Sequence, residues 1–321
     1  MSKATGRSAQ PKRSTTERAN LYDEVTARII AELEAGRLPW VQPWGSKGLG
    51  PCLPHNAATA RRYSGINILL LWGAAQERGF AAQGWLTFRQ ALGAGGSVRK
   101  GEHGTTVFYA DRFVPEGEKA RAVEQGDDPK AVPFLKRFTV FNVEQCEGLP
   151  DGLAGDPAPL PDCEAVPIAE EVIAASGVTF RVGGAEAYYA PGPDFVMVPP
   201  QRAFHVPINY YRTALHELTH ATGHAKRLAR NILNSFGSKD YAREELVAEM
   251  GSAFLCAALG IEPTVRHADY LGSWLDVLRE DNKAIFRAAS QASKAADWLL
   301  ARHREAQEAK VGAAASERLA A

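Results

Sequence analysis

Apolar residues along the chain recur mostly at the three-to-four-residue spacing of an amphipathic helix. Within residues 17–35, Leu21, Val25 and Ile29 fall at this spacing, and Gly36 follows where such a helix would stop. The same spacing predicts further helices at residues 66–75, 168–176, 241–259 and 269–301. Helices therefore dominate the predicted fold.

Strand patterns are fewer and fall into two groups. They predict strands at residues 105–109, 134–143, 178–182 and 195–198. Between the groups lies a stretch rich in Pro, Gly, Ala and Asp, which is typical of a linker. We therefore predict an α+β fold with two domains. The predicted parts are, in order, a disordered arm (1–16), a first domain (17–150), the linker (151–167), a second domain (168–302) and a loose tail (303–321).

The sequence His216-Glu217-Leu218-Thr219-His220 carries the most specific chemical signal in the chain. Two histidines four residues apart lie on one face of a helix, so both imidazoles can reach one Zn²⁺. Glu217 can then reach the water on the metal and act as general base, as in a zinc peptidase. Apolar Leu215 gives this helix a buried side, and Gly223 marks its expected end. The alternative is a helix whose two histidines serve only the structure.

A zinc site of this kind needs a third protein ligand. A metzincin would place a histidine at position 226, but Lys226 stands there, which excludes that class. The following helix offers three acids instead, Glu244, Glu245 and Glu249. We predict Glu249 as the ligand. Glu245, four residues away on the same face, is then a partner that orients a histidine, or is itself the ligand. Small residues at 251–253 would let this helix approach the histidine helix closely.

The formal charge of the chain is zero, but it is unevenly distributed. Residues 1–112 contain 15 Lys and Arg against 8 Asp and Glu, a balance of +7, whereas residues 151–321 contain 17 against 22, a balance of −5. A basic half with interleaved aromatic residues suits single-stranded nucleic acid, because cations contact phosphates and rings stack on unpaired bases. The alternative is that the tryptophans are core and the charges are solvated. The candidates for DNA contacts are Trp40, Trp44, Arg61, Arg62, Tyr63, Asn67, Trp85, Arg89, Arg99 and Lys100.

The four cysteines are scattered and form no C-x-x-C pair, which is typical of free thiols in a reducing cytoplasm. The N-terminus lacks the apolar stretch of a signal peptide, and no apolar run reaches the length of a membrane span. We therefore expect a cytoplasmic protein with no membrane partner.

A series of short motifs in the first half resembles a known family. They are Pro39-Trp40, Pro43-Trp44, Tyr63-Ser64-Gly65-Ile66-Asn67, Trp85-Leu86-Thr87-Phe88, Lys100-Gly101-Glu102 and Phe141-Asn142-Val143-Glu144-Gln145. Together they resemble the N-terminal single-stranded-DNA-binding domain of ArdC-type antirestriction proteins, which is similar to the N-terminal part of TraC-type primases of conjugative plasmids. The motifs at 216–224 and 241–249 are similar to the metallopeptidase domain of that family. Residues 249–255 also resemble the glutamate-bearing helix of ImmA/IrrE-like peptidases.

The resemblance implies a conjugation-associated protein that binds the entering single strand and carries a zincin fold. The expected activity is that of a gluzincin-like zinc metallopeptidase. Its protein or peptide substrate would be the host restriction machinery, brought near by the flexible linker between the domains. The alternative is a non-catalytic protein that coats single-stranded DNA, with a structural or vestigial zinc site. A fragment related to primases is less favoured, because the sequence contains no acidic metal-binding motif of a polymerising domain.

Overall fold

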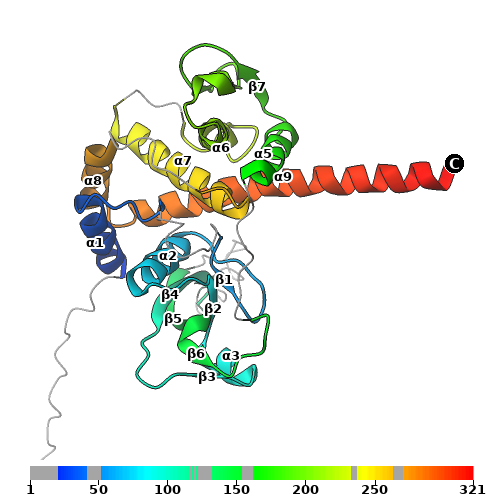
Figure 1. The fold of residues 1–321 in the computed structure, drawn as a ribbon. Coiled ribbons are helices and arrows are strands. Elements are labelled where there is room, and N and C mark those ends of the chain that lie inside the picture. Colours follow the sequence, from blue (N-terminus) through cyan, green and yellow to red (C-terminus); the bar gives the residue numbers. More distant parts are fainter. Residues whose placement is uncertain are drawn as a thin grey trace, which may run out of the picture.

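The computed structural model describes residues 21–41, 52–115, 118, 121, 132–153, 162–232, 237–262 and 270–320. These residues form two units that pack on either side of the long helix α9 (Ala284–Ala320) (Figure 1). Within these ranges, no helix combines the length and the apolar composition that a membrane span requires.

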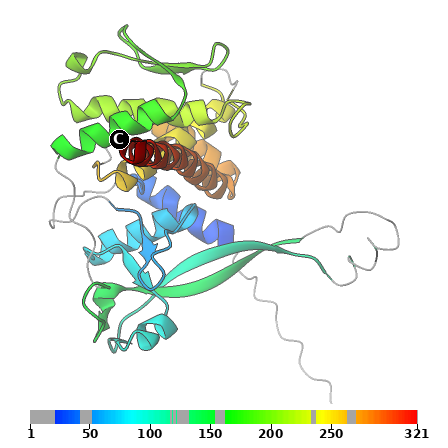
Figure 2. The same ribbon diagram turned by 90° about the vertical axis from the view of Figure 1, so that its right-hand side faces the viewer.

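The first unit is built on a four-stranded sheet in the order β1-β2-β5-β4. Its strands are β1 (His55–Asn56), β2 (Gly84–Leu86), β4 (Thr105–Phe113) and β5 (Val132–Asn142). β4 and β5 form a long antiparallel ribbon that extends away from the body of the molecule (Figure 2). Three smaller elements complete the sheet region: α3 (Phe88–Gly93), β3 (Ser97–Val98) and its partner β6 (Cys146–Glu147). Helix α2 (Ile66–Arg78) covers the sheet, and its Leu71 packs with Trp85 and Val140.

The second unit places helices against a small three-stranded sheet. The helices are α5 (Asp162–Ala175), α6 (Ile208–Thr222), α7 (Lys239–Ala258) and α8 (Leu271–Glu280). The strands are β7 (Thr179–Val182), β8 (Tyr188–Ala190) and β9 (Phe195–Val198). β9 lies in the middle of this sheet, parallel to β7 and antiparallel to β8, so β8 forms one edge.

The two units share one apolar core. Helix α1 (Leu21–Glu34) precedes the first sheet in sequence but packs against α8 of the second unit (Figure 1). The ring of Trp40 meets that of Trp274 on α8, with centroids 5.6 Å apart, and Trp72 of α2 meets Phe254 of α7 at 5.7 Å. All four rings belong to the same buried cluster. The expected flexible tether is therefore not the main connection, because the units are held together by direct packing.

Most of the predicted elements are confirmed. The predicted helices at 66–75, 168–176 and 241–259 correspond to α2, α5 and α7, and Gly36, with φ of +72°, follows α1 as expected. Cys52, Cys146 and Cys256 are free thiols. The predicted disordered arm lies outside the described residues.

Two boundary predictions are wrong. Helix α5 begins at Asp162, inside the predicted linker, and the predicted loose tail is helical through Ala320. The tail is rich in Ala and Glu, which favour helix, so it continues α9 without a break. The side chains of His303 and Gln307 also contact Glu171 of α5, at 3.0 and 2.6 Å.

Replacing Trp85 by alanine is expected to lower the free energy of unfolding by about 3–5 kcal/mol, because the ring is fully buried beneath α2. Urea denaturation of the full-length chain measures this loss. Phe88→Ala is the matched control, since Phe88 lies in the same unit with 51% of its surface exposed. Its expected cost is about 1 kcal/mol or less. Equal losses in the two variants would contradict the assignment of Trp85 to the core.

Candidate functional site

Helix α6 positions two imidazoles side by side. His216 and His220 are one helical turn apart, His216 is buried and His220 is half-buried, and both rings face Glu245 of α7. The rings meet edge to face with centroids 4.8 Å apart. Their Nε2 atoms lie 3.2 Å from each other. Both nitrogens therefore point toward one common position.

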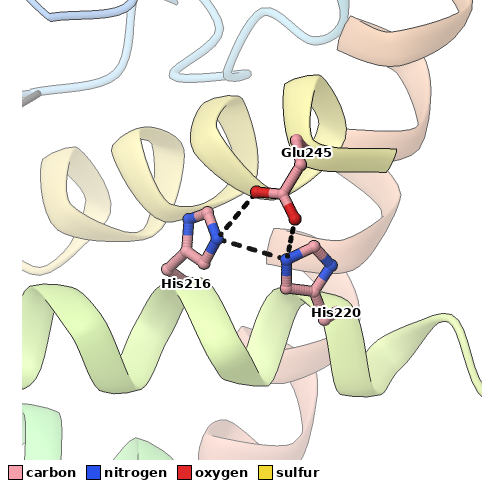
Figure 3. A group of neighbouring side chains, drawn as sticks. All are labelled: His216, His220 and Glu245. Carbon is pink, nitrogen blue, oxygen red and sulfur yellow. Dashed lines mark hydrogen bonds and ion pairs between the residues drawn. The ribbon is translucent and has the colours of Figure 1, made fainter. Parts of the chain in front are cut away.

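Helix α7 supplies the third side chain of the group. Glu245 directs one carboxylate oxygen to Nε2 of His216 and the other to Nε2 of His220, each at 3.5 Å (Figure 3). One ligand atom from each of these three residues lies within 4.8 Å of the others. Two imidazoles and a carboxylate in this arrangement form a suitable donor set for a divalent metal.

Glu249, the third ligand predicted from the sequence, does not join this group. Its carboxylate lies 3.7 Å from Nδ1 of His216, on the opposite side of that ring. Glu245 and Glu249 do share a face of α7, as their spacing requires, but α7 crosses α6 so that only Glu245 lies over the gap between the histidines. Glu249 instead occupies the orienting position that the sequence analysis gave to Glu245.

Glu244 orients the second histidine in the same way. Its carboxylate lies 3.3 Å from Nδ1 of His220, and because a carboxylate can only accept, the ring nitrogen donates. Arg230 donates to both oxygens of Glu244, at 2.7 and 3.1 Å. Burial alone would raise the pKa of Glu244, but His220 and Arg230 hold it below its usual value. Sequence analysis missed the contribution of Arg230, which comes from a loop without a motif.

The charges around the histidines favour a bound cation. Burial favours the neutral form of His220, but the carboxylates of Glu244 and Glu245 raise its pKa well above the usual value, so without a metal its Nε2 carries a proton that faces Glu245. Burial alone would raise the pKa of Glu245, but the two histidines lower it by a larger amount. The pKa therefore lies below its usual value, and this carboxylate stays ionised. The ionised carboxylate and the two Nε2 atoms converge on one point, where a divalent metal can take the place of the proton on His220. The residues therefore fit a divalent metal.

A cavity of about 230 Å³ opens beside the group. Glu217 lines it next to the two histidines, and its side chain is otherwise buried. Tyr188 and Tyr189 of the edge strand β8 also line it. The site is thus a cleft lined by the two histidines and by the edge strand β8.

Two tyrosines form another wall of this cavity. The hydroxyls of Tyr241 on α7 and Tyr270, next to α8, lie 3.2 Å apart. Burial, together with Tyr270 and Glu245, raises the pKa of Tyr241, so its phenol stays protonated and can donate a hydrogen bond. Tyr241 begins the motif at 241–249, but the sequence analysis gave neither tyrosine a role in the site.

A salt bridge anchors β8 to the end of α6. Arg227 pairs with Asp194 in the turn after β8 and donates to the hydroxyl of Tyr189, at 3.2 Å. Its Nε also donates to the backbone oxygen of Ala221, at 2.6 Å. His224 lies 3.7 Å from Asp194, at the margin of this contact. The distance between the strand edge and the histidines is therefore fixed by side-chain contacts.

Some of the residues predicted to contact DNA are buried in the structure, and others are exposed. Trp40 and Trp85 are fully buried, so neither ring can stack on a base, and that part of the prediction is wrong. Asn67 is engaged with the backbone of Phe108, donating at 2.7 Å and accepting at 2.8 Å. Tyr63 is half-buried against the core of the first unit.

The charged candidates remain at the surface. Exposed side chains are found at Arg61, Arg62, Arg89, Arg99 and Lys100. Arg99 pairs with Glu102 at 3.1 Å and donates to the backbone of Glu144. Trp44 lies outside the described residues. Sequence analysis missed the aromatic residues that are exposed in this unit, which include Phe88, Tyr109 and Phe138.

Comparisons with known proteins agree with this architecture. A model of the N-terminal domain of the anti-restriction factor ArdC matches residues 19–141, and a model of zincin-like metallopeptidases matches residues 167–291. The crystal structure of metal-free ArdC from plasmid R388 is 39% identical, with a TM-score of 0.74, and the match covers 89% of this chain and 98% of that one. The chain belongs to the ArdC family of antirestriction proteins.

Other relatives of this ArdC-family chain extend the comparison. The Mn(II)-bound structure of the R388 protein is 40% identical, with a TM-score of 0.73, over 88% of this chain and 98% of that one. An uncharacterised protein, y4eC, from Sinorhizobium fredii is 39% identical over 92% of this chain and 96% of its own length. The DNA primase TraC of Escherichia coli is 41% identical over 87% of this chain, which spans only 27% of the primase.

Gly251→Ala is expected to destabilise the protein by about 1–3 kcal/mol, because its added Cβ would lie 2.4 Å from Cγ2 of Thr219, where α7 crosses α6. Chemical denaturation of the full chain provides the measurement. Gly272→Ala is the control, since Gly272 is also helical and its added Cβ would meet nothing within 4 Å. A Gly251→Ala variant as stable as the control would contradict the close approach of the helices.

Proposed function

We propose that this ArdC-family chain binds single-stranded DNA through its first unit and hydrolyses peptide bonds in the cleft of its second unit. The observation that carries the peptidase proposal is the convergence of His216, His220 and Glu245 beside the buried carboxylate of Glu217. A purely structural metal site has no need of that additional carboxylate in the cleft.

The proposed metal ligands are Nε2 of His216, Nε2 of His220 and the carboxylate of Glu245. Two imidazoles and one carboxylate are a common ligand set of catalytic zinc, so we propose Zn²⁺ as the resident ion. Mn²⁺ is the alternative, because an ArdC structure that is 40% identical is described as Mn(II)-bound. Either ion would act as a Lewis acid toward a substrate carbonyl and would lower the pKa of water at the site.

Residues of the chain itself would transfer the proton, stabilise the developing charge and bind the peptide. Glu217 would accept a proton from the attacking water and return it to the leaving amine. Tyr241 would donate its phenol proton as a hydrogen bond to the substrate oxygen on which negative charge develops. An extended peptide would lie along the edge strand β8, whose outer backbone groups can pair with it, next to the histidines.

The binding of single-stranded DNA is supported by the first unit. Its match to the ArdC N-terminal domain and the similarity to TraC primases supply the context. Exposed arginines at positions 61, 62 and 89 offer phosphate contacts. We propose that the protein acts in the cytoplasm of a cell that receives a conjugative element, and that its peptidase substrates are proteins of the host restriction machinery.

Glu245→Ala is expected to abolish binding of Zn²⁺ or Mn²⁺, because the carboxylate between the two Nε2 atoms would be lost. Metal analysis of the purified full-length variants measures the metal content per chain. Glu249→Ala is the matched control on the same helix face, and we expect it to retain metal with affinity lowered about 10–100-fold, as for other residues that orient a ligand. Loss in Glu249→Ala with retention in Glu245→Ala would assign the ligand to Glu249.

Glu217→Gln is expected to keep the metal and the binding of single-stranded DNA but to eliminate peptide hydrolysis, because an amide cannot accept the proton. New protein N-termini in recipient cells, compared by mass spectrometry between wild type and variant during DNA entry, measure the hydrolysis. Protection against restriction is scored in the same cells. If protection survives in this variant without new N-termini, antirestriction works by coating the strand, and the peptidase has another role or none.

A further inference from the structure

Midway along the β4–β5 ribbon, just beyond the part covered by α2, an aromatic pair lies next to a lysine. We propose that Tyr109, Phe138 and Lys136 form a stacking platform for unpaired bases of single-stranded DNA. This inference rests on the proposed binding of single-stranded DNA by the first unit, and it assigns that binding to a surface that the sequence analysis did not select.

The strand register puts the three side chains on one face of the ribbon. Tyr109 lies opposite Lys136, and Val107 lies opposite Phe138, so these four residues point to the same side. The rings of Tyr109 and Phe138 are 6.4 Å apart in an edge-to-face contact. The ammonium of Lys136 lies 5.1 Å from the centroid of the Phe138 ring. The result is a compact aromatic surface with a cation at its margin.

The same face is covered nearer the body of the protein. Val107 and Val140 are buried beneath α2, together with Trp85. One step further along the ribbon the cover ends, and 53% of Tyr109 and 40% of Phe138 are exposed. The aromatic pair therefore begins where the core of the first unit stops, and its rings contribute less to that core than the valines do.

The opposite face of the ribbon is already used for packing. Phe108 meets Phe286 of α9, with centroids 6.3 Å apart, and Arg137 pairs with Glu24 of α1 at 2.9 Å. This face fixes the ribbon to α9 and α1. The face with Tyr109 is turned away from that contact, at a ribbon that projects from the molecule (Figure 2).

The chemistry of the platform favours single-stranded DNA over duplex DNA or an apolar protein. Unpaired bases can stack on exposed rings, whereas bases in a duplex are covered by their neighbours. A lysine next to the rings suits the phosphate that follows a stacked base. Residues 1–112, which include Tyr109, carry a balance of +7. Charge complementarity thus favours a polyanion as the occupant.

The test compares ring-removing and ring-preserving variants of the full-length chain. Affinity for a fluorescein-labelled oligothymidylate is measured by fluorescence anisotropy, with the same labelled strand annealed to its complement as the duplex probe. The Tyr109→Ala, Phe138→Ala double variant is expected to bind the single strand at least about tenfold more weakly, since one stacked base contributes that much. The exchange variant Tyr109→Phe, Phe138→Tyr keeps both rings and should bind like wild type.

A further pair of variants tests the specificity of the surface. Lys136→Gln should reduce the salt dependence of binding by about one phosphate contact, a change that loss of packing alone would not produce. Phe88→Ala removes an equally exposed ring from α3 and should leave binding unchanged.

The outcomes separate this inference from the proposed function. Unchanged binding in the double alanine variant, while wild type binds the single strand, overturns the platform and leaves DNA binding in place. A wild-type chain that binds no oligothymidylate overturns the proposed DNA binding and the platform with it. Equal losses for single strand and duplex would overturn stacking as the mode of contact. If the double alanine variant does not fold, the other variants decide. The platform is supported if the exchange variant binds like wild type and Lys136→Gln lowers the salt dependence of binding. An unchanged salt dependence in Lys136→Gln overturns it.

Discussion

The close packing of α7 on α6 is the constraint on which the candidate site depends. Gly251 faces Thr219 at the crossing, and a single additional carbon there would lie 2.4 Å from the threonine methyl group. Thr219 is fully buried and bonds to the backbone of its own helix at 2.8 Å, so it cannot move aside easily. The close approach of α7 to α6 lets the carboxylate of Glu245 come within 3.5 Å of both imidazoles.

The same packing concentrates acids around the histidines, and this makes the site dependent on cations. Glu217, Glu244, Glu245 and Glu249 are all buried near two imidazoles, and Arg230 supplies one permanent positive charge to Glu244. A buried carboxylate without a partner is strongly unfavourable. The helices are therefore arranged so that protons or a divalent metal must balance the remaining charge, and the geometry of the Nε2 atoms favours a single ion between them.

Sequence reasoning succeeded where the information is local. The spacing of His216 and His220 fixes their common helix face whatever surrounds them, and apolar periodicity located α7. The choice between Glu245 and Glu249 depends on how two helices cross, which spacing within one helix does not contain. Whether an aromatic residue is exposed also depends on parts of the chain that are distant in sequence. Trp85 and Phe138 both lie on β-strands of one sheet, yet α2 covers the first and leaves the second open.

The shared core changes how the two proposed activities are related. A flexible tether would raise the local concentration of a peptidase near a DNA strand without fixing its direction. Here Trp72 of the first unit packs on Phe254 of α7, the helix that also holds Glu245, and the backbone of Gly65 donates to Ser293 of α9 at 2.8 Å. The ribbon and the cleft consequently belong to one packed body. A strand bound at the ribbon would then have a defined position relative to the cleft, so the geometry of the complex, in addition to proximity, would select which DNA-bound protein reaches Glu217.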